Sequence, residues 1–172
     1  MVKFFNYFIL TFLIFLNSCS QKEKEVSAIK ETTQDLEMVS AYKEAYNAIE
    51  LNDPYYAAKK FLEAELLFPQ SEWASKSLLM ASYSYYLQDY YSEAFSSLDR
   101  FLKTYPNDEN ISYAHYLIAI CYYETIEDEK RDIEPIIKAK NKFEFILTNY
   151  PNTDFAIDAK FKLGLIQNLL GS

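Results

Sequence analysis

The sequence predicts an all-α fold, in which antiparallel helix pairs stack into an α-α superhelix. From Asp35 to Leu170, apolar residues recur at spacings of three and four, as they do along one face of an amphipathic helix. The 172 residues include only two glycines and five prolines, which is too few for a turn-rich β fold. Sixteen tyrosines and 13 phenylalanines supply large side chains for packing one helix against another.

Residues 1–18 have the profile of a lipoprotein signal peptide. Lys3 precedes an apolar run at 4–16 that only Asn6 and Thr11 interrupt. This run is shorter than the roughly 20 residues that a membrane-spanning helix needs. The signal ends in Leu16-Asn17-Ser18-Cys19, which resembles a bacterial lipobox. The resemblance implies cleavage before Cys19 and attachment of lipid, such as palmitate, to this cysteine; the alternative is an ordinary secretory signal with a coincidental cysteine.

Residues 19–34 are expected to form a disordered tether. The segment is charged and poor in large apolar groups, so it cannot bury enough surface to order itself. Gln21 stands where the inner-membrane retention signal of enterobacterial lipoproteins has aspartate. This difference favours sorting to the outer membrane.

A repeat of 37 residues organises the third segment, 35–172, which is predicted to be the folded domain. The shared pattern is a small residue, an alanine, a large apolar residue and a proline. Its three copies are Ala45, Ala57, Phe61 and Pro69; Ser82, Ala94, Leu98 and Pro106; and Ala119, Ala139, Phe143 and Pro151. An insertion of eight residues lengthens the third copy, and Gly164 is the small residue of a fourth. Small residues let helices approach closely and proline ends a helix, so the pattern resembles the tetratricopeptide repeat, a pair of antiparallel helices.

The repeat places seven helices in order along the chain. Their expected ranges are 35–51, 54–67, 72–87, 92–104, 110–124, 135–148 and 154–170. The turn Asn52-Asp53-Pro54 separates the first two helices, and Pro135 suits the first turn of the sixth. The seventh helix is either a solvated cap or half of an incomplete pair, in which case the chain is a fragment of a longer array.

Four further stretches resemble one protein family more specifically than the tetratricopeptide pattern does. They are 57–61 with Phe68-Pro69; 99–101 with Tyr105-Pro106; 113–117 with 121–124; and Arg131-Asp132 followed by Phe143 and Tyr150-Pro151. Together with the lipobox, they resemble the BamD family, also called ComL or YfiO-like, of the outer-membrane β-barrel assembly machinery. Members carry about five repeats, so the resemblance covers the N-terminal three and a half. It implies a scaffold that is lipid-anchored in the outer membrane, faces the periplasm, and binds the barrel-forming subunit, other lipoproteins of the machinery and unfolded outer-membrane proteins.

The candidate partner-binding residues are tyrosines on two adjacent first helices and a charged pair in the insertion. They are Tyr86, Tyr116, Tyr123, Arg131 and Asp132. Tyrosine suits a binding surface because it combines apolar area with a hydrogen-bonding tip. Packing is the competing interpretation, and it is the one we expect for Tyr85 and Tyr122, which lie where the repeat signature also places an aromatic residue.

Composition argues against catalytic, metal, cofactor and nucleic-acid sites. The net charge of −8 has the wrong sign for binding phosphates, and two glycines cannot build a nucleotide-binding loop. One histidine and two cysteines are too few for the usual zinc sites or catalytic triads. His115 and Cys121 lie six residues apart on one predicted helix and so do not share a face; we expect Cys121 to be a buried thiol.

Two functions without catalysis therefore remain. The first is a scaffold in outer-membrane protein assembly. The alternative is an envelope tetratricopeptide lipoprotein that acts as an adaptor for peptidoglycan enzymes. An enzyme is a third interpretation, but no pair of carboxylates stands out from the charges expected on exposed helix faces.

Overall fold

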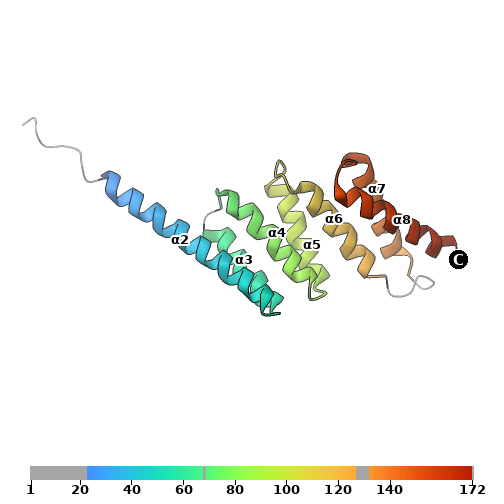
Figure 1. The fold of residues 1–172 in the computed structure, drawn as a ribbon, viewed down its shortest axis with the longest axis horizontal. Coiled ribbons are helices and arrows are strands. Elements are labelled where there is room, and N and C mark those ends of the chain that lie inside the picture. The colour runs from blue at the N-terminus through green and yellow to red at the C-terminus, as the bar shows by residue number, and fades with distance from the viewer. Residues whose placement is uncertain (1–22, 68, 127–131, 172) are drawn as a thin grey trace, which may run out of the picture. The chain divides into compact units, whose positions relative to one another are not determined.

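The structure, a computed structural model, describes residues 23–67, 69–126 and 132–171, with side chains from Leu36 onward except that of Glu72. Residues 1–35 and 36–172 form separate units, and the first is described only by its helical course from Glu23. The described residues form seven helices and no strand, as expected of an all-α fold (Figure 1). The helices are α2 (Glu23–Glu50), α3 (Pro54–Leu67), α4 (Glu72–Tyr86), α5 (Tyr91–Thr104), α6 (Ile111–Glu124), α7 (Glu134–Asn149) and α8 (Asp154–Gly171). None of them is long and apolar enough to cross a membrane.

The helices from α3 to α8 lie within one residue of their predicted bounds. The first predicted helix differs, because α2 begins at Glu23 and not at Asp35. Residues 23–34 contain neither glycine nor proline and include three glutamates and two lysines, which have high helix propensity. Such residues favour a helix through their backbone propensity. The role of 19–34 as a tether stays a prediction.

The helices form antiparallel pairs, α2 with α3, α4 with α5 and α6 with α7, and α8 follows (Figure 1). Short turns join the helices of the first two pairs. In the first two pairs the turn contains a residue in the left-handed region, Asn52 with φ 61° and Asp89 with φ 60°. These residues lie 37 positions apart, and Asn and Asp tolerate this conformation better than most residues do. Asp53 then starts α3, because its Oδ1 accepts the backbone N–H of Tyr56 at 3.1 Å.

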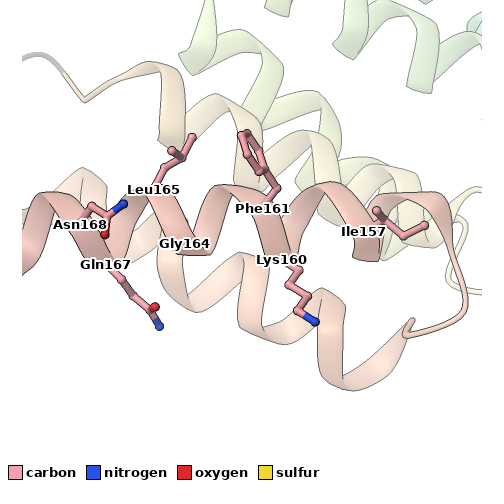
Figure 2. Close-up of a pocket in the computed structure, with 7 residues that line it drawn as sticks. All are labelled: Ile157, Lys160, Phe161, Gly164, Leu165, Gln167 and Asn168. Atoms are coloured by element: carbon pink, nitrogen blue, oxygen red, sulfur yellow. The ribbon is translucent and has the colours of Figure 1, made fainter.

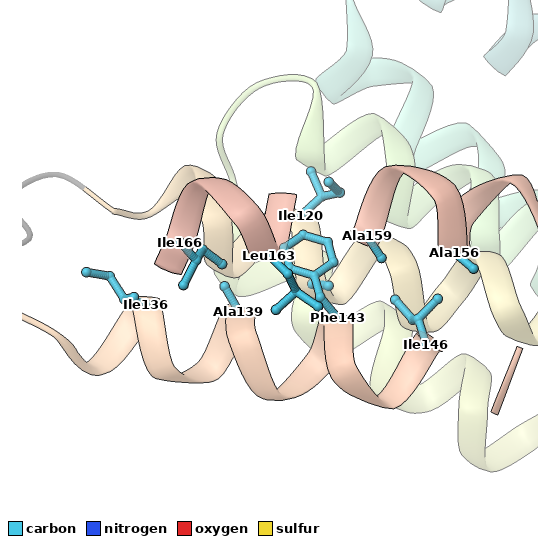
Figure 3. Close-up of a cluster of buried hydrophobic side chains, with 10 residues drawn as sticks. Ile120, Ile136, Ala139, Phe143, Ile146, Ala156, Ala159, Leu163 and Ile166 are labelled. Carbon is cyan, nitrogen blue, oxygen red and sulfur yellow. The ribbon is translucent and has the colours of Figure 1, made fainter. Parts of the chain in front are cut away.

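The core follows the repeat. The small residues Ala45, Ser82 and Ala119 are 0% exposed. The large apolar residues of the three copies, Phe61, Leu98 and Phe143, are also 0% exposed. Figure 3 shows the last part of the core, where Ala139 and Phe143 of α7 cluster with Ile120 of α6 and Leu163 of α8. Each pair therefore buries its apolar stripe against its own members and against the next pair, as stacked helical repeats do.

An ion pair with a buried carboxylate joins the second helices of the first two pairs. Glu65 of α3 is 4% exposed, and Arg100 of α5 donates two hydrogen bonds to its carboxylate. Arg100 Nη1 donates to Oε1 at 2.9 Å and Nη2 donates to Oε2 at 2.7 Å. The Tyr105 hydroxyl lies 3.5 Å from Oε1. A carboxylate bound at both oxygens by one guanidinium is held in a defined position, so this pair fixes how α3 meets α5.

Candidate partner-binding surface

The predicted partner-binding tyrosines stand on α4 and α6, the first helices of the second and third pairs. Tyr86 ends α4, while Tyr116 and Tyr123 lie on α6. All three side chains are half-buried. Tyr86 and Tyr123 occupy corresponding places, each four residues after the buried small residue of its helix.

Tyr86 belongs to a group of four tyrosines that we call the tyrosine surface. Its members are Tyr83, Tyr86, Tyr113 and Tyr116. The ring centroids of Tyr83 and Tyr86 lie 6.1 Å apart. Burial raises the pKa of both Tyr113 and Tyr116, and the nearby hydroxyl of Tyr86 adds to each shift. Burial also raises the pKa of Tyr86. These three hydroxyls are therefore protonated at neutral pH and can donate hydrogen bonds.

Tyr116 also connects two helices. Its hydroxyl donates to Oδ2 of Asp158 on α8 at 2.6 Å. Its ring stacks on that of Phe155, with centroids 5.1 Å apart. Tyr116 thus holds α6 against α8, a structural role in addition to its place in the tyrosine surface.

Tyr123 lies at a different place on α6 and meets a positive charge. Its ring packs edge-on against Phe143, with centroids 6.2 Å apart. Lys162 Nζ of α8 lies 4.5 Å from the Tyr123 centroid, which is a cation–π geometry. Tyr123 therefore presents an aromatic ring together with a lysine.

Tyr85 and Tyr122, which we expected in the core, are half-buried and pack against it. The Tyr122 ring lies 4.4 Å from that of Phe95, and Lys138 Nζ lies 5.5 Å from its centroid. Packing is thus part of their role, although both residues lie at the edge of the core.

Asp132 lies beside Tyr122, in a small cleft before α7. The cleft is lined by Phe95, Tyr122, Thr125, Asp132, Glu134, Pro135 and Lys138. The exposed Asp132 carboxylate accepts the backbone N–H of Glu134 at 3.0 Å, at the start of α7. A negative charge is favourable at a helix N-terminus, so Asp132 has a local structural use. The cleft does not include Tyr86, Tyr116 or Tyr123, and Arg131 and Cys19 lie outside the described residues.

Two residues of α8 contribute contacts that the sequence analysis missed. Asp158 binds Tyr116 and Lys162 covers Tyr123, although a solvated cap was one of the two expectations for this helix. The repeat alignment places Asp158 at the position that Tyr113 holds in the preceding repeat. Because Tyr113 belongs to the tyrosine surface, this correspondence could have identified Asp158 as a residue near that surface. Its partner lies 42 residues away, across the insertion, so local sequence alone does not reveal the bond.

The remaining reactive side chains do not form a site in the described part of the chain. No three histidine, cysteine or acidic residues of this part are grouped as metal ligands. Cys121 is buried, and this burial raises the pKa of its thiol to about 12, far from the reactive thiolate. His115 packs between the rings of Phe145 and Tyr150. Burial and then the charge of Lys142 lower the pKa of His115, so it is neutral at neutral pH.

Comparison with known proteins places this arrangement in a family. A family model described as YfiO, outer membrane lipoprotein, matches residues 34–172. A protein of Caulobacter vibrioides named outer membrane protein assembly factor BamD is 39% identical over 114 residues, which is 66% of this chain and 37% of the relative. The protein of that name from Rickettsia prowazekii is 35% identical over 114 residues, with 66% of this chain and 45% of the relative covered.

A third relative with that name extends the likeness over nearly the whole chain. It comes from Xylella fastidiosa strain Temecula1 and is 24% identical over 171 residues, covering 94% of this chain and 57% of the relative. The chain thus spans between about a third and somewhat more than half of the length of these relatives. Because the family model covers the helical repeats from end to end, the chain belongs to the YfiO family of outer membrane lipoproteins.

Proposed function

We propose that this chain is a non-catalytic, protein-binding scaffold in the assembly of outer-membrane proteins. The observation that carries the proposal is the match of the YfiO family model over 34–172. The names of the relatives, outer membrane protein assembly factor, support it. Stacked helix pairs with half-buried tyrosines suit this role, because they present an extended surface to a partner.

The proposed partners are the barrel-forming subunit and other lipoproteins of the assembly machinery, together with unfolded outer-membrane proteins. The tyrosine surface is the first candidate contact. Its rings supply apolar area, and the protonated hydroxyls of Tyr86 and Tyr113 supply donors for the backbone carbonyls of an incoming chain. The second candidate contact lies around Tyr123 and Lys162, and the third is the exposed carboxylate of Asp132, with Arg131 beside it in sequence.

The proposed location is the periplasmic face of the outer membrane. Cys19 is the proposed site of lipid attachment, and residues 19–34 are the proposed tether. The lipobox resemblance at Leu16-Asn17-Ser18-Cys19 supports the anchor. The description of the family model as an outer membrane lipoprotein supports the compartment.

The test is co-purification of the full chain from detergent-solubilised membranes. We expect the barrel-forming subunit to co-purify with the wild-type chain, and less of it with Tyr86→Ala. Tyr90→Ala is the matched control, because Tyr90 is an exposed tyrosine outside the tyrosine surface. Recovery of peptidoglycan hydrolases or synthases without the barrel-forming subunit would contradict the proposal. Equal recovery with Tyr86→Ala and wild type would remove the tyrosine surface from it but leave the scaffold role in place.

A further inference from the structure

The C-terminal ends of α4 and α6 both favour a positive charge. The two helices run in the same direction in Figure 1, and they end at Tyr86 and Glu124. The free carbonyls at a helix C-terminus carry a partial negative charge, which a nearby cation stabilises. Neither helix has a basic residue in its last turn. Neither helix therefore supplies the cation that its own C-terminal end favours.

Two exposed carboxylates, those of Asp89 and Glu124, add full negative charges beside Tyr86. Burial raises the pKa of Tyr86, and the charges of Glu124 and Asp89 raise it further. Burial and then the hydrogen bond to Asp89 raise the pKa of Tyr91, and the charge of Glu124 adds to that shift. Both carboxylates thus lie close to both tyrosines.

Tyr91 links these carboxylates to the rings of the tyrosine surface. Its hydroxyl donates to Oδ1 of Asp89 at 2.7 Å, and its ring centroid lies 6.3 Å from that of Tyr86. Both rings are half-buried and pack against the core, so their positions are fixed. We call Tyr86, Tyr91, Asp89 and Glu124 the acidic edge of the tyrosine surface. Aromatic rings beside carboxylates suit the binding of a cation, because the ring faces and the carboxylates both attract positive charge.

The carboxylates of the acidic edge form no ion pair with any lysine or arginine that the structure describes. The ion pairs in this part of the chain are made by other acidic residues, such as Glu65 with Arg100. Glu124 is also unfavourable for its own helix, because an acidic side chain at a helix C-terminus meets the negative end of the dipole. A positively charged partner would relieve both the repulsion and the lack of a counter-charge.

We propose that the acidic edge binds an arginine side chain of the polypeptide that the tyrosine surface receives. This proposal rests on the proposed function and specifies the chemistry of the partner. Arginine suits the acidic edge better than lysine does, because its planar guanidinium stacks on aromatic rings while its forked donors reach carboxylates. The residues that flank this arginine in the partner then contact the other rings of the tyrosine surface, those of Tyr83, Tyr113 and Tyr116.

The first experiment titrates the full chain in detergent with a synthetic probe, a glycine–serine peptide that carries one central arginine. The control peptide has citrulline in its place, which keeps the shape of the side chain but has no charge. NMR signals of the tyrosine rings report binding. We expect the arginine peptide to bind about tenfold more tightly, the combined effect of two exposed ion pairs and one cation–π contact. Equal affinities for the two peptides would overturn the proposal.

An exposed ring on α8, that of Phe161, provides an internal control in the same titration (Figure 2). Lys160 is the one charged residue among those that line the hollow around it. A guanidinium is repelled by this lysine, so the Phe161 signals should not respond to the arginine peptide. Equal responses of Phe161 and of the tyrosines would show that the peptide binds any exposed ring, and would overturn the proposal.

The second experiment compares Glu124→Gln with Glu109→Gln, its matched control. Glu109 is exposed and precedes the start of α6, at the opposite end of the helix from Glu124. We expect Glu124→Gln to bind the arginine peptide about threefold more weakly than wild type, as the loss of one exposed ion pair predicts. It should melt no earlier than wild type, because the substitution removes a negative charge from the C-terminal end of α6. Equal affinities of the two variants, or early melting of Glu124→Gln, would overturn the proposal.

The co-purification test separates this inference from the proposed function. We expect Glu124→Gln to recover less of the barrel-forming subunit than Glu109→Gln does. Equal recovery with the two variants would overturn the inference and leave the scaffold role in place. Absence of the subunit from the wild-type preparation would contradict the scaffold role, whereas the peptide titration still decides whether the acidic edge binds arginine.

Discussion

At the residue scale, the ion pair between Glu65 and Arg100 is the clearest case of a buried charge that depends on one partner. The Glu65 side chain is 6% exposed, whereas that of Arg100 is 45% exposed. Most of the desolvation cost therefore falls on the carboxylate, and the two hydrogen bonds from Arg100 offset it. Removing Arg100 alone and removing both residues should therefore change the free energy of unfolding by different amounts, which a mutation series can measure.

We predict that Arg100→Leu lowers the free energy of unfolding by about 3 kcal/mol, because it leaves the buried Glu65 carboxylate without its positively charged partner. The double variant Glu65→Leu with Arg100→Leu should unfold within about 1 kcal/mol of wild type, since a packed apolar pair replaces the ion pair. Urea denaturation of the three proteins measures both differences. Equal losses in the single and double variants would show that the pair itself contributes the stability.

A second residue-scale prediction concerns pH. Burial and Lys142 lower the pKa of His115 in the folded chain below the about 6.5 expected in the unfolded chain. The unfolded chain therefore binds the proton first as pH falls. The stability associated with neutral His115 is complete above about pH 6.5 and is lost as pH falls from there through the folded pKa. The loss is at most about 1.4 kcal/mol per pH unit for one proton.

Thermal unfolding between pH 7 and pH 5 tests this prediction. His115→Phe keeps an aromatic ring against Phe145 and Tyr150 but cannot take up a proton. We expect the variant to lose less stability than wild type over this interval. Parallel curves for the two proteins would mean that His115 does not titrate in this range.

At the scale of the helices, the same substitution should have opposite effects at two aligned positions. Ala119 is 0% exposed beneath α7, so leucine there overpacks the core, at a typical cost of about 1–3 kcal/mol. Gly164 faces open space, so leucine there removes the helix penalty of glycine and stabilises the chain by up to about 1 kcal/mol. Circular dichroism melting of the two variants measures the contrast. Equal melting temperatures would show that the repeat alignment is wrong.

The helices themselves were predictable because their signals are local. Apolar periodicity together with Pro54, Pro106 and Pro151 determines where most of them begin and end. The early start of α2 was missed because that prediction relied on buried periodicity, whereas charged residues of high propensity extend the helix. Contacts between α8 and α6, such as Tyr116 with Asp158, depend on how helices pack across an insertion. Sequence spacing does not encode that packing.

At the scale of the whole molecule, the proposed function places a folded array of helices behind a lipid anchor. We predict that the membrane-extracted protein begins at Cys19 and carries acyl chains there, because Leu16-Asn17-Ser18-Cys19 resembles a lipobox, a motif that directs cleavage before its cysteine. Intact-mass and peptide mass spectrometry check the modification. Cys19→Ala should release the chain from the membrane without changing the melting of the helices. An unmodified N-terminus at another residue would contradict the anchor.

The contacts between neighbouring helices predict which helix of the array unfolds locally at the lowest free energy. From α4 to α8, helices contact their immediate neighbours, and the first helices of successive pairs also touch. Stability in such an array is a sum of nearest-neighbour terms. Among the described helices, α8 contacts α7 and α6, whereas α6 contacts α4, α5, α7 and α8, so α8 has fewer of these terms. Amide hydrogens of α8 should therefore exchange with solvent before those of α6, in openings that leave α4 to α7 folded.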